Sequence, residues 1–155
     1  MDVEFIFFSL GTEPYWQEHL GTTRADVRAT TIVGRSLGAG LNLNPILARE
    51  LLTRDYDVLV KCLNGRLELA SAFAIAKARR KPFVFWATLW WQPVTWLGWL
   101  SQPPLDCVYR GADAIVTDGD HISHFVSGHG VDPGKIFTAE ISVDNDRFML
   151  PVDDA

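Results

Sequence analysis

Short apolar runs alternate with helix-length amphipathic segments along most of the chain. The runs of strand length lie at residues 3–9, 58–62, 83–87, 113–117 and 136–138. The segments that carry apolar residues at helical spacing lie at residues 46–54, 66–80 and 118–127. Strands that alternate with helices are typical of a parallel sheet covered on both faces. The pattern therefore predicts one α/β domain over residues 1–155, a Rossmann-like parallel sheet with helices on both faces.

Four further segments are assigned from their residue types. Residues 26–33 are rich in β-branched side chains, which predicts a strand near an edge of the sheet. Three glycines predict a loop at residues 34–43. Residues 90–100 contain a proline and a glycine and are also predicted to form a loop, followed by a helical turn at residues 105–111.

Composition narrows the class of protein. Hydrophobic residues make up 48% and charged residues 21% of the chain, as in a folded globular domain. The net charge of -5 argues against a broad nucleic-acid-binding surface. The two cysteines, Cys62 and Cys107, lack a metal-ligand spacing and do not form a disulfide framework. No signal peptide and no apolar run of ~18 residues is present. We therefore expect a cytoplasmic protein.

The familiar phosphate-binding and catalytic motifs are missing from the sequence. It contains no G-x-G-x-x-G after a strand, no Walker motif and no G-x-S-x-G. His121, His124 and His129 lie near Asp118 and Asp120, a set of residue types that can bind a metal. The start of a surface helix also collects acidic caps and incidental histidines, and this simpler explanation is favoured. We expect no metal and no cofactor.

Tryptophan is concentrated in one part of the chain. Five of the six tryptophans are Trp86, Trp90, Trp91, Trp96 and Trp99. Trp86 ends a predicted strand and is expected in the core. Two interpretations of the others remain: a small core beneath a loop, or an exposed surface for a membrane, an apolar acceptor tail or a partner domain. The segment contains no lysine or arginine, so it offers no attraction for anionic lipids.

Six phrases follow one another from residue 56 to residue 148. They are Y-D-V-L-V at 56–60, the alanine-rich segment 67–77, R-K-P-F-V at 80–84, R-G-A-D-A-I-V at 110–116, G-V-D-P-G-K-I-F at 130–137 and V-D-N-D-R-F at 143–148. In this order the phrases resemble the N-terminal, acceptor-side domain of family 4 glycosyltransferases. Those enzymes have the two-domain GT-B fold. The two closing phrases are the most specific part of the resemblance.

The resemblance implies a reaction class and a partial machinery for it. Enzymes of this family transfer a sugar from a nucleoside diphosphate sugar to an acceptor hydroxyl. The chain resembles the acceptor half, so the expected ligand is a sugar acceptor, lipid-linked in one version. The C-terminal donor-binding domain has no counterpart in the 155 residues. The resemblance thus implies a truncated version of the fold, inactive alone, with a separate donor-domain chain as partner. Thr88 stands where the family commonly has a histidine.

Candidate binding residues follow from the predicted fold. Ligands of open parallel sheets bind beyond the carboxyl ends of the strands. The candidate acceptor-binding residues at these positions are Glu13, Asn64, Thr88, Trp90 and Asp118. Asp118 is also predicted to cap the helix that follows it. No catalytic residue is assigned.

A second hypothesis makes the chain a non-catalytic subunit. It would then anchor or recruit a separate catalytic chain, as a peripheral protein on the membrane surface. Trp91, Trp96 and Trp99 are the predicted membrane or partner surface.

Overall fold

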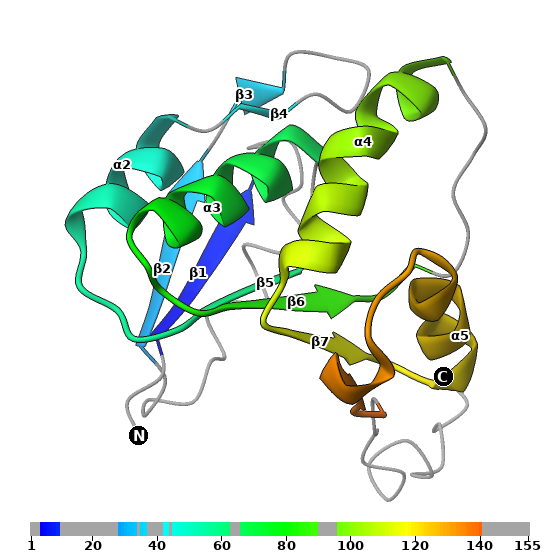
Figure 1. Ribbon diagram of the computed structural model, residues 1–155. Coiled ribbons are helices and arrows are strands. Elements are labelled where there is room, and N and C mark those ends of the chain that lie inside the picture. Colours follow the sequence, from blue (N-terminus) through cyan, green and yellow to red (C-terminus); the bar gives the residue numbers. More distant parts are fainter. Residues whose placement is uncertain are drawn as a thin grey trace, which may run out of the picture.

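The computed structural model describes residues 4–9, 28–33, 35–36, 42–43, 45–62, 66–89 and 96–140 (Figure 1). The strands are β1 (Glu4–Ser9), β2 (Arg28–Val33), β3 (Arg35–Ser36), β4 (Asn42–Leu43), β5 (Leu59–Cys62), β6 (Phe83–Ala87), β7 (Ala114–Thr117) and β8 (Ile136–Thr138). The helices are α2 (Pro45–Thr53), α3 (Arg66–Ala78), α4 (Trp96–Gly111) and α5 (Asp120–Gly128), with a 3-10 turn at Pro133–Lys135. Strands and helices alternate from β5 onward, as predicted.

A four-stranded sheet in the order β5-β6-β7-β8 forms the centre of the described structure. Every neighbouring pair in it is parallel. β1 and β2 form a separate parallel pair, and β3 and β4 a short antiparallel pair. The α/β class and the Rossmann-like parallel sheet are therefore confirmed.

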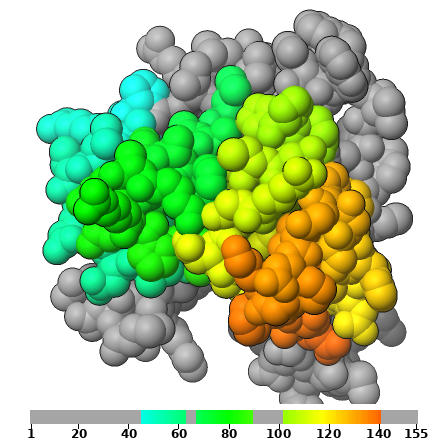
Figure 2. Space-filling view, viewed as in Figure 1, coloured from blue at the N-terminus to red at the C-terminus, as the bar shows by residue number. Residues whose placement is uncertain are grey.

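The helices between these strands lie on one face of the sheet. Because the strand order follows the chain order, each right-handed crossover steps in the same direction. This rule places α3, α4 and α5 on the same side. Figure 2 shows α3, α4 and the segment from α5 onward adjoining one another on the face in view. α3, α4 and α5 do not supply the helix layer predicted for the opposite face, so that layer stays a prediction.

The core lies between this helix layer and the sheet. On β6, Phe83, Phe85 and Ala87 are buried and alternate with half-buried Val84 and Trp86. β7 continues the same alternation. The buried apolar residues of the helices are Leu47, Leu51, Leu69, Ala72, Ala76, Leu105, Val108, Tyr109, Ile122 and Val126. The period of two on the strands thus separates a buried face from a second, less buried one.

The second face of the sheet is also apolar. By register, Val60, Val84 and Phe137 lie on the side opposite the helix layer. Val60 and Phe137 are each 55% exposed. Trp86 lies on this same face, half-buried rather than in the core as predicted from the sequence.

Two predicted loops are wrong in part. Residues 34–43 were predicted as a loop, but they contain the paired strands β3 and β4. Residues 90–100 were predicted as a loop, yet α4 begins at Trp96 and continues through Pro103 and Pro104. A proline removes one helical N–H and clashes with the carbonyl four residues earlier. Local preference therefore favours a helix that starts after Pro103 and Pro104. Tertiary packing of Leu105, a buried residue of α4, outweighs that local preference.

Asp113 anchors the amino end of the sheet. Its Oδ2 accepts hydrogen bonds from Lys77 Nζ and from the Phe83 backbone N–H, both at 2.7 Å. These two bonds, the Lys77 bond first, lower the pKa of the Asp113 carboxyl below its usual range. One side chain therefore connects α3, β6 and β7 at the edge opposite the candidate site.

Candidate functional site

The carboxyl ends of β5, β6 and β7 lie together at one edge of the sheet, which we call the carboxyl edge. Cys62, the last residue of β5, is the register partner of Trp86 on β6. β6 and β7 end in register, with Ala87 opposite Thr117. Thr88 and Asp118 directly follow these two paired ends. Parallel pairing thus brings two residues thirty positions apart in the sequence to neighbouring places.

Asp118 is held by a hydrogen bond from the neighbouring strand. The indole N–H of Trp86 donates to Asp118 Oδ1 at 2.6 Å. Both side chains are half-buried, where a hydrogen bond to a charged acceptor is strong. Within the described part of the chain, Asp118 Oδ2 accepts no hydrogen bond. Among the described residues, the Asp118 carboxylate is therefore bound at Oδ1 and not at Oδ2.

The predicted helix cap at Asp118 is wrong. The N-cap position of α5 is Gly119, and no side chain caps the helix. The Gly119 carbonyl instead accepts from the backbone N–H groups of Ile122 and Ser123, both at 3.1 Å. Asp118 lies one residue before this N-cap, and its Oδ1 is bound to the Trp86 indole, a contact that the sequence pattern does not reveal.

A cluster of three hydroxyls lies beside Asp118. Thr117 Oγ1 is 2.7 Å from Ser123 Oγ and 3.5 Å from Thr138 Oγ1, and Ser123 Oγ is 3.2 Å from Thr138 Oγ1. Thr117 is fully buried. Its hydroxyl is satisfied because β7, α5 and β8 each contribute one member. The cluster fixes the segment that carries Asp118. A polar residue at the end of an apolar strand was the sequence signal for it.

Cys62 forms a neutral part of the same edge. Burial raises the pKa of the Cys62 thiol; Lys61 opposes this rise, and the negative charge of Asp118 adds to it. Cys62 is therefore a protonated thiol at neutral pH, whereas the nucleophilic form of cysteine is the thiolate. Cys62 therefore contributes a small, uncharged wall to the edge.

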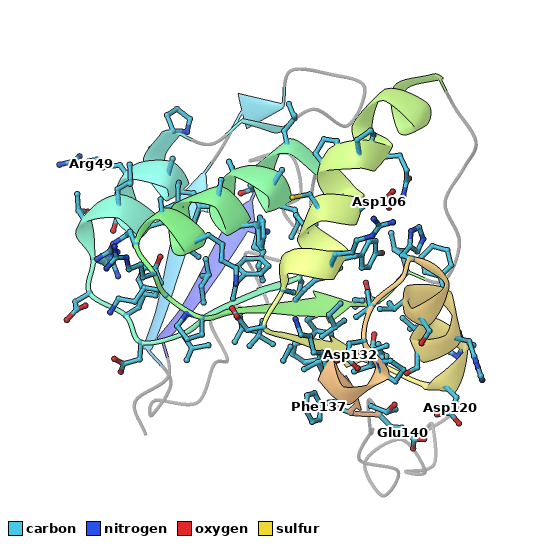
Figure 3. All side chains as sticks on the ribbon, in the orientation of Figure 1. Arg49, Asp106, Asp120, Asp132, Phe137 and Glu140 are labelled. Carbon is cyan, nitrogen blue, oxygen red and sulfur yellow. The ribbon has the colours of Figure 1, made fainter. Side chains whose placement is uncertain are left out.

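Exposed groups border the carboxyl edge. Thr88 is exposed, and the neighbouring Leu89 is 44% exposed. Figure 3 shows Asp120, at the start of α5, and Glu140, beyond β8, on the same side of the molecule. Both carboxylates are exposed. The rim thus combines a hydroxyl, an apolar side chain and negative charge.

A buried ionisable pair lies nearby, where α3 follows β5. Glu68, in the first turn of α3, is 2% exposed, and neither of its carboxyl oxygens has a hydrogen-bond partner among the described residues. Burial raises the pKa of Glu68, and the charge of Lys61 on β5 partly opposes the rise. Burial also lowers the pKa of the Lys61 ammonium, with Glu68 opposing that change. The sequence analysis missed this pair; its signal was an acidic residue beside the buried Leu69.

Among the described residues, His121, His124 and His129 form no metal-binding cluster. His129 Nδ1 lies 3.0 Å from Asp106 Oδ1, and its ring stacks on Tyr109 with centroids 4.8 Å apart. His129 thus joins the end of α5 to α4. Among the described residues, no group of three or more metal-binding side chains is present. A shallow groove of about 570 Å³ lies along α4 beside Asp106.

Two of the five predicted acceptor-binding residues fall within the described structure, and they are Thr88 and Asp118. Glu13, Asn64 and Trp90 lie outside the described residues. Of the predicted membrane or partner surface, Trp91 also lies outside them. Trp96 and Trp99 belong to the first turns of α4, and their side chains are outside the description.

Comparisons with known proteins leave the chain without a match. No family model, no curated protein and no solved structure matches it. Among the helices of the described ranges, none has the length and apolar character needed to cross a membrane. Fold and site together define an α/β protein with a polar, acidic carboxyl edge.

Proposed function

We propose that this chain is the acceptor-binding half of a glycosyltransferase with the GT-B fold, and that it binds a hydroxyl-bearing acceptor at the carboxyl edge. The observation that carries the proposal is the pairing of exposed Thr88 with half-buried Asp118 at two neighbouring strand ends. Ligands of parallel sheets bind beyond such ends, which supports the location. The resemblance of the sequence phrases to family 4 glycosyltransferases supports the reaction class.

The two side chains suit a sugar hydroxyl chemically. A carboxylate only accepts hydrogen bonds, whereas a threonine hydroxyl both donates and accepts. A ligand hydroxyl between them donates to Asp118 and exchanges a second bond with Thr88. A hydrogen bond to a charged group contributes about 1.5–3 kcal/mol. The charged contact to Asp118 and the neutral contact to Thr88 together give about 2–4.5 kcal/mol, which corresponds to millimolar or weaker binding of a small acceptor.

The charge of the edge argues for an acceptor and against the sugar donor. Asp118, Asp120 and Glu140 are acidic, and a nucleoside diphosphate is an anion that they repel. In this proposal the donor is bound by a separate domain or chain. The residues described here orient the acceptor, which is the positional part of catalysis.

A binding or membrane-anchoring subunit is the second candidate. Because α4 begins at Trp96, positions 96 and 99 are about one helical turn apart and share a helix face. Two tryptophans on one face at the start of a helix favour contact with a lipid surface or an apolar acceptor tail. This candidate predicts binding to phosphatidylcholine vesicles that does not depend on Thr88 or Asp118.

Calorimetric titration tests the first proposal. The ligands are the methyl α- and β-glycosides of glucose, galactose, mannose and N-acetylglucosamine, with UDP-glucose and GDP-mannose as donors. We expect at least one glycoside to bind at millimolar concentration, no measurable heat from either donor, and no sugar transfer by this chain alone. Asp118→Asn should lower the affinity for the glycoside. Asp57→Asn, at an exposed carboxylate outside the edge, should leave that affinity unchanged. Donor binding in the micromolar range, or no glycoside binding, would contradict the proposal.

A further inference from the structure

The Trp86–Asp118 hydrogen bond joins two residues that simpler rules place elsewhere. A tryptophan at the end of a central strand ordinarily packs into the core, and an aspartate before a helix ordinarily caps it. Here Trp86 is only half-buried and lies on the sheet face opposite the helix layer. Its indole N–H reaches across to Asp118 Oδ1 at 2.6 Å. Trp86 is thus not packed into the core and Asp118 does not cap α5, and the two side chains bind each other at the carboxyl edge.

The contact controls what the Asp118 carboxylate can do. A free carboxylate at this position would compete for the unbonded N–H groups of the first turn of α5. The indole N–H has no acceptor capacity, so it takes one carboxylate oxygen and leaves the other unchanged. Within the described residues, Oδ2 of Asp118 has no hydrogen-bond donor. The hydrogen bond therefore orients the carboxylate, and no described residue uses its second oxygen.

The surroundings limit the kind of group that can use this acceptor. Cys62 ends β5, which β6 separates from β7 and Asp118. Burial raises the pKa of its thiol, so the thiol is neutral. The hydroxyl of Thr117, one residue before Asp118, is hydrogen-bonded to Ser123 and Thr138. The exposed Thr88 follows the strand end paired with that of Asp118, and its hydroxyl can add a second contact. A neutral hydrogen-bond donor therefore suits the position, whereas an anion does not.

We propose that Trp86 is a positioning residue for acceptor binding: it holds Asp118 through Oδ1, so that Oδ2 accepts a hydrogen bond from a hydroxyl of the ligand. This inference rests on the proposed function and adds the residue that sets the orientation of the acceptor. If Trp86 only connected β6 to β7, replacing it would change the stability of the fold but not the affinity for the ligand.

Two variants separate the positioning role from a structural one. Trp86→Phe keeps an aromatic ring and removes the donor; Asp118→Asn removes the charge. The probes are the methyl glycosides named above, titrated by calorimetry. We expect each variant to lose about tenfold or more in affinity for a glycoside that binds the wild type. The double variant should lose no more than Asp118→Asn alone, because the two residues act as one unit. Tyr56→Phe, which removes a buried hydroxyl that has no hydrogen-bond partner among the described residues, is the aromatic control and should bind the glycoside normally.

The outcomes distinguish this inference from the proposed function. If the wild type binds glycosides and Trp86→Phe binds them equally well, the positioning role is overturned and the acceptor site remains. If the wild type binds none, both proposals fail. Where Trp86→Phe does not fold, the Trp86 indole N–H signal in an NMR titration of the wild type decides. We expect that signal to move on addition of glycoside and to be displaced in Asp118→Asn. A signal unaffected by saturating glycoside contradicts the inference.

Discussion

Glu68 and Asp113 are two carboxyl groups whose pKa values the fold moves in opposite directions. Hydrogen bonds from Lys77 and the Phe83 N–H lower the pKa of Asp113 from its ordinary value of 3.8. The stability that Asp113 contributes is present above that value and is lost as the pH falls. Burial raises the pKa of Glu68 from its ordinary value of 4.5. Its contribution is fully present below 4.5 and declines as the pH rises toward the folded-state pKa.

Replacing Glu68 with glutamine should therefore change how stability depends on pH. Glu68→Gln removes the group that must ionise in a buried place, so its advantage over the wild type should grow between pH 4.5 and 7. We expect Glu68→Gln to gain stability over the wild type at pH 7, because its neutral amide carries no charge that burial penalises. Loss of the charge opposite Lys61 reduces this gain without reversing it, because burial is the largest cause of the shift.

Urea denaturation at several pH values measures this effect. Asp57→Asn, at an exposed carboxylate, controls for the change in net charge. The account is wrong if Glu68→Gln loses stability relative to the wild type as the pH rises, or if both variants behave alike.

Single residues also show how far sequence reasoning reaches. Thr88 and Asp118 were predicted because the rule for strand ends depends only on where strands stop, and apolar runs mark that well. The bond between Trp86 and Asp118 was not predicted, since it depends on the register of two strands thirty residues apart. Glu68 was missed because its burial comes from tertiary packing rather than from its neighbours in sequence.

At the scale of elements, the packing of α4 against α3 depends on Gly111. A Cβ built on Gly111 would lie 2.5 Å from Cζ of Phe73 on α3. That ring packs edge-on against Phe83, with centroids 5.3 Å apart, so moving it disturbs the core. Gly128, the last residue of α5, has no atom within 4 Å of the same position. The two helix-ending glycines therefore have different roles.

Gly111→Ala and Gly128→Ala should shift stability in opposite directions. We expect Gly111→Ala to lower the free energy of unfolding by about 1–2 kcal/mol through overpacking. Gly128→Ala should raise it by up to about 1 kcal/mol, because alanine favours a helix more than glycine does. Chemical denaturation with an unchanged slope measures both differences. Equal shifts in the two variants would show that Phe73 does not restrict Gly111.

Element boundaries were predictable where periodicity and breakers agree. β6 occupies the predicted residues 83–87, because Pro82 precedes a short apolar run. α4 is longer than predicted, since Pro103 and Pro104 lie inside it rather than before it. Local residue preferences favoured a helix start beyond the prolines, whereas buried contacts along the helix favour its full length.

At the scale of the whole molecule, topology concentrates chemistry at one edge. Parallel strands end on the same side, so Cys62, Trp86, Thr88 and Asp118 come together although they span residues 62–118. The opposite edge is organised by Asp113 and Lys77. The parallel α/β class could be predicted from alternation alone. The acidic rim could not be predicted in this way, because it depends on where α5 begins and β8 ends relative to the end of β7.

The central claim is that the carboxyl edge is the ligand-binding surface, and NMR mapping on backbone amides tests it most directly. The isotope-labelled chain is titrated with the panel of methyl glycosides. The account predicts that the signals of residues 87–89, 117–120 and 138–140 move together with one dissociation constant. Signals at the opposite edge, residues 77–82, and along the α4 groove, residues 103–111, should stay in place. Movement confined to either of those two regions, with the carboxyl edge unchanged, would contradict the account.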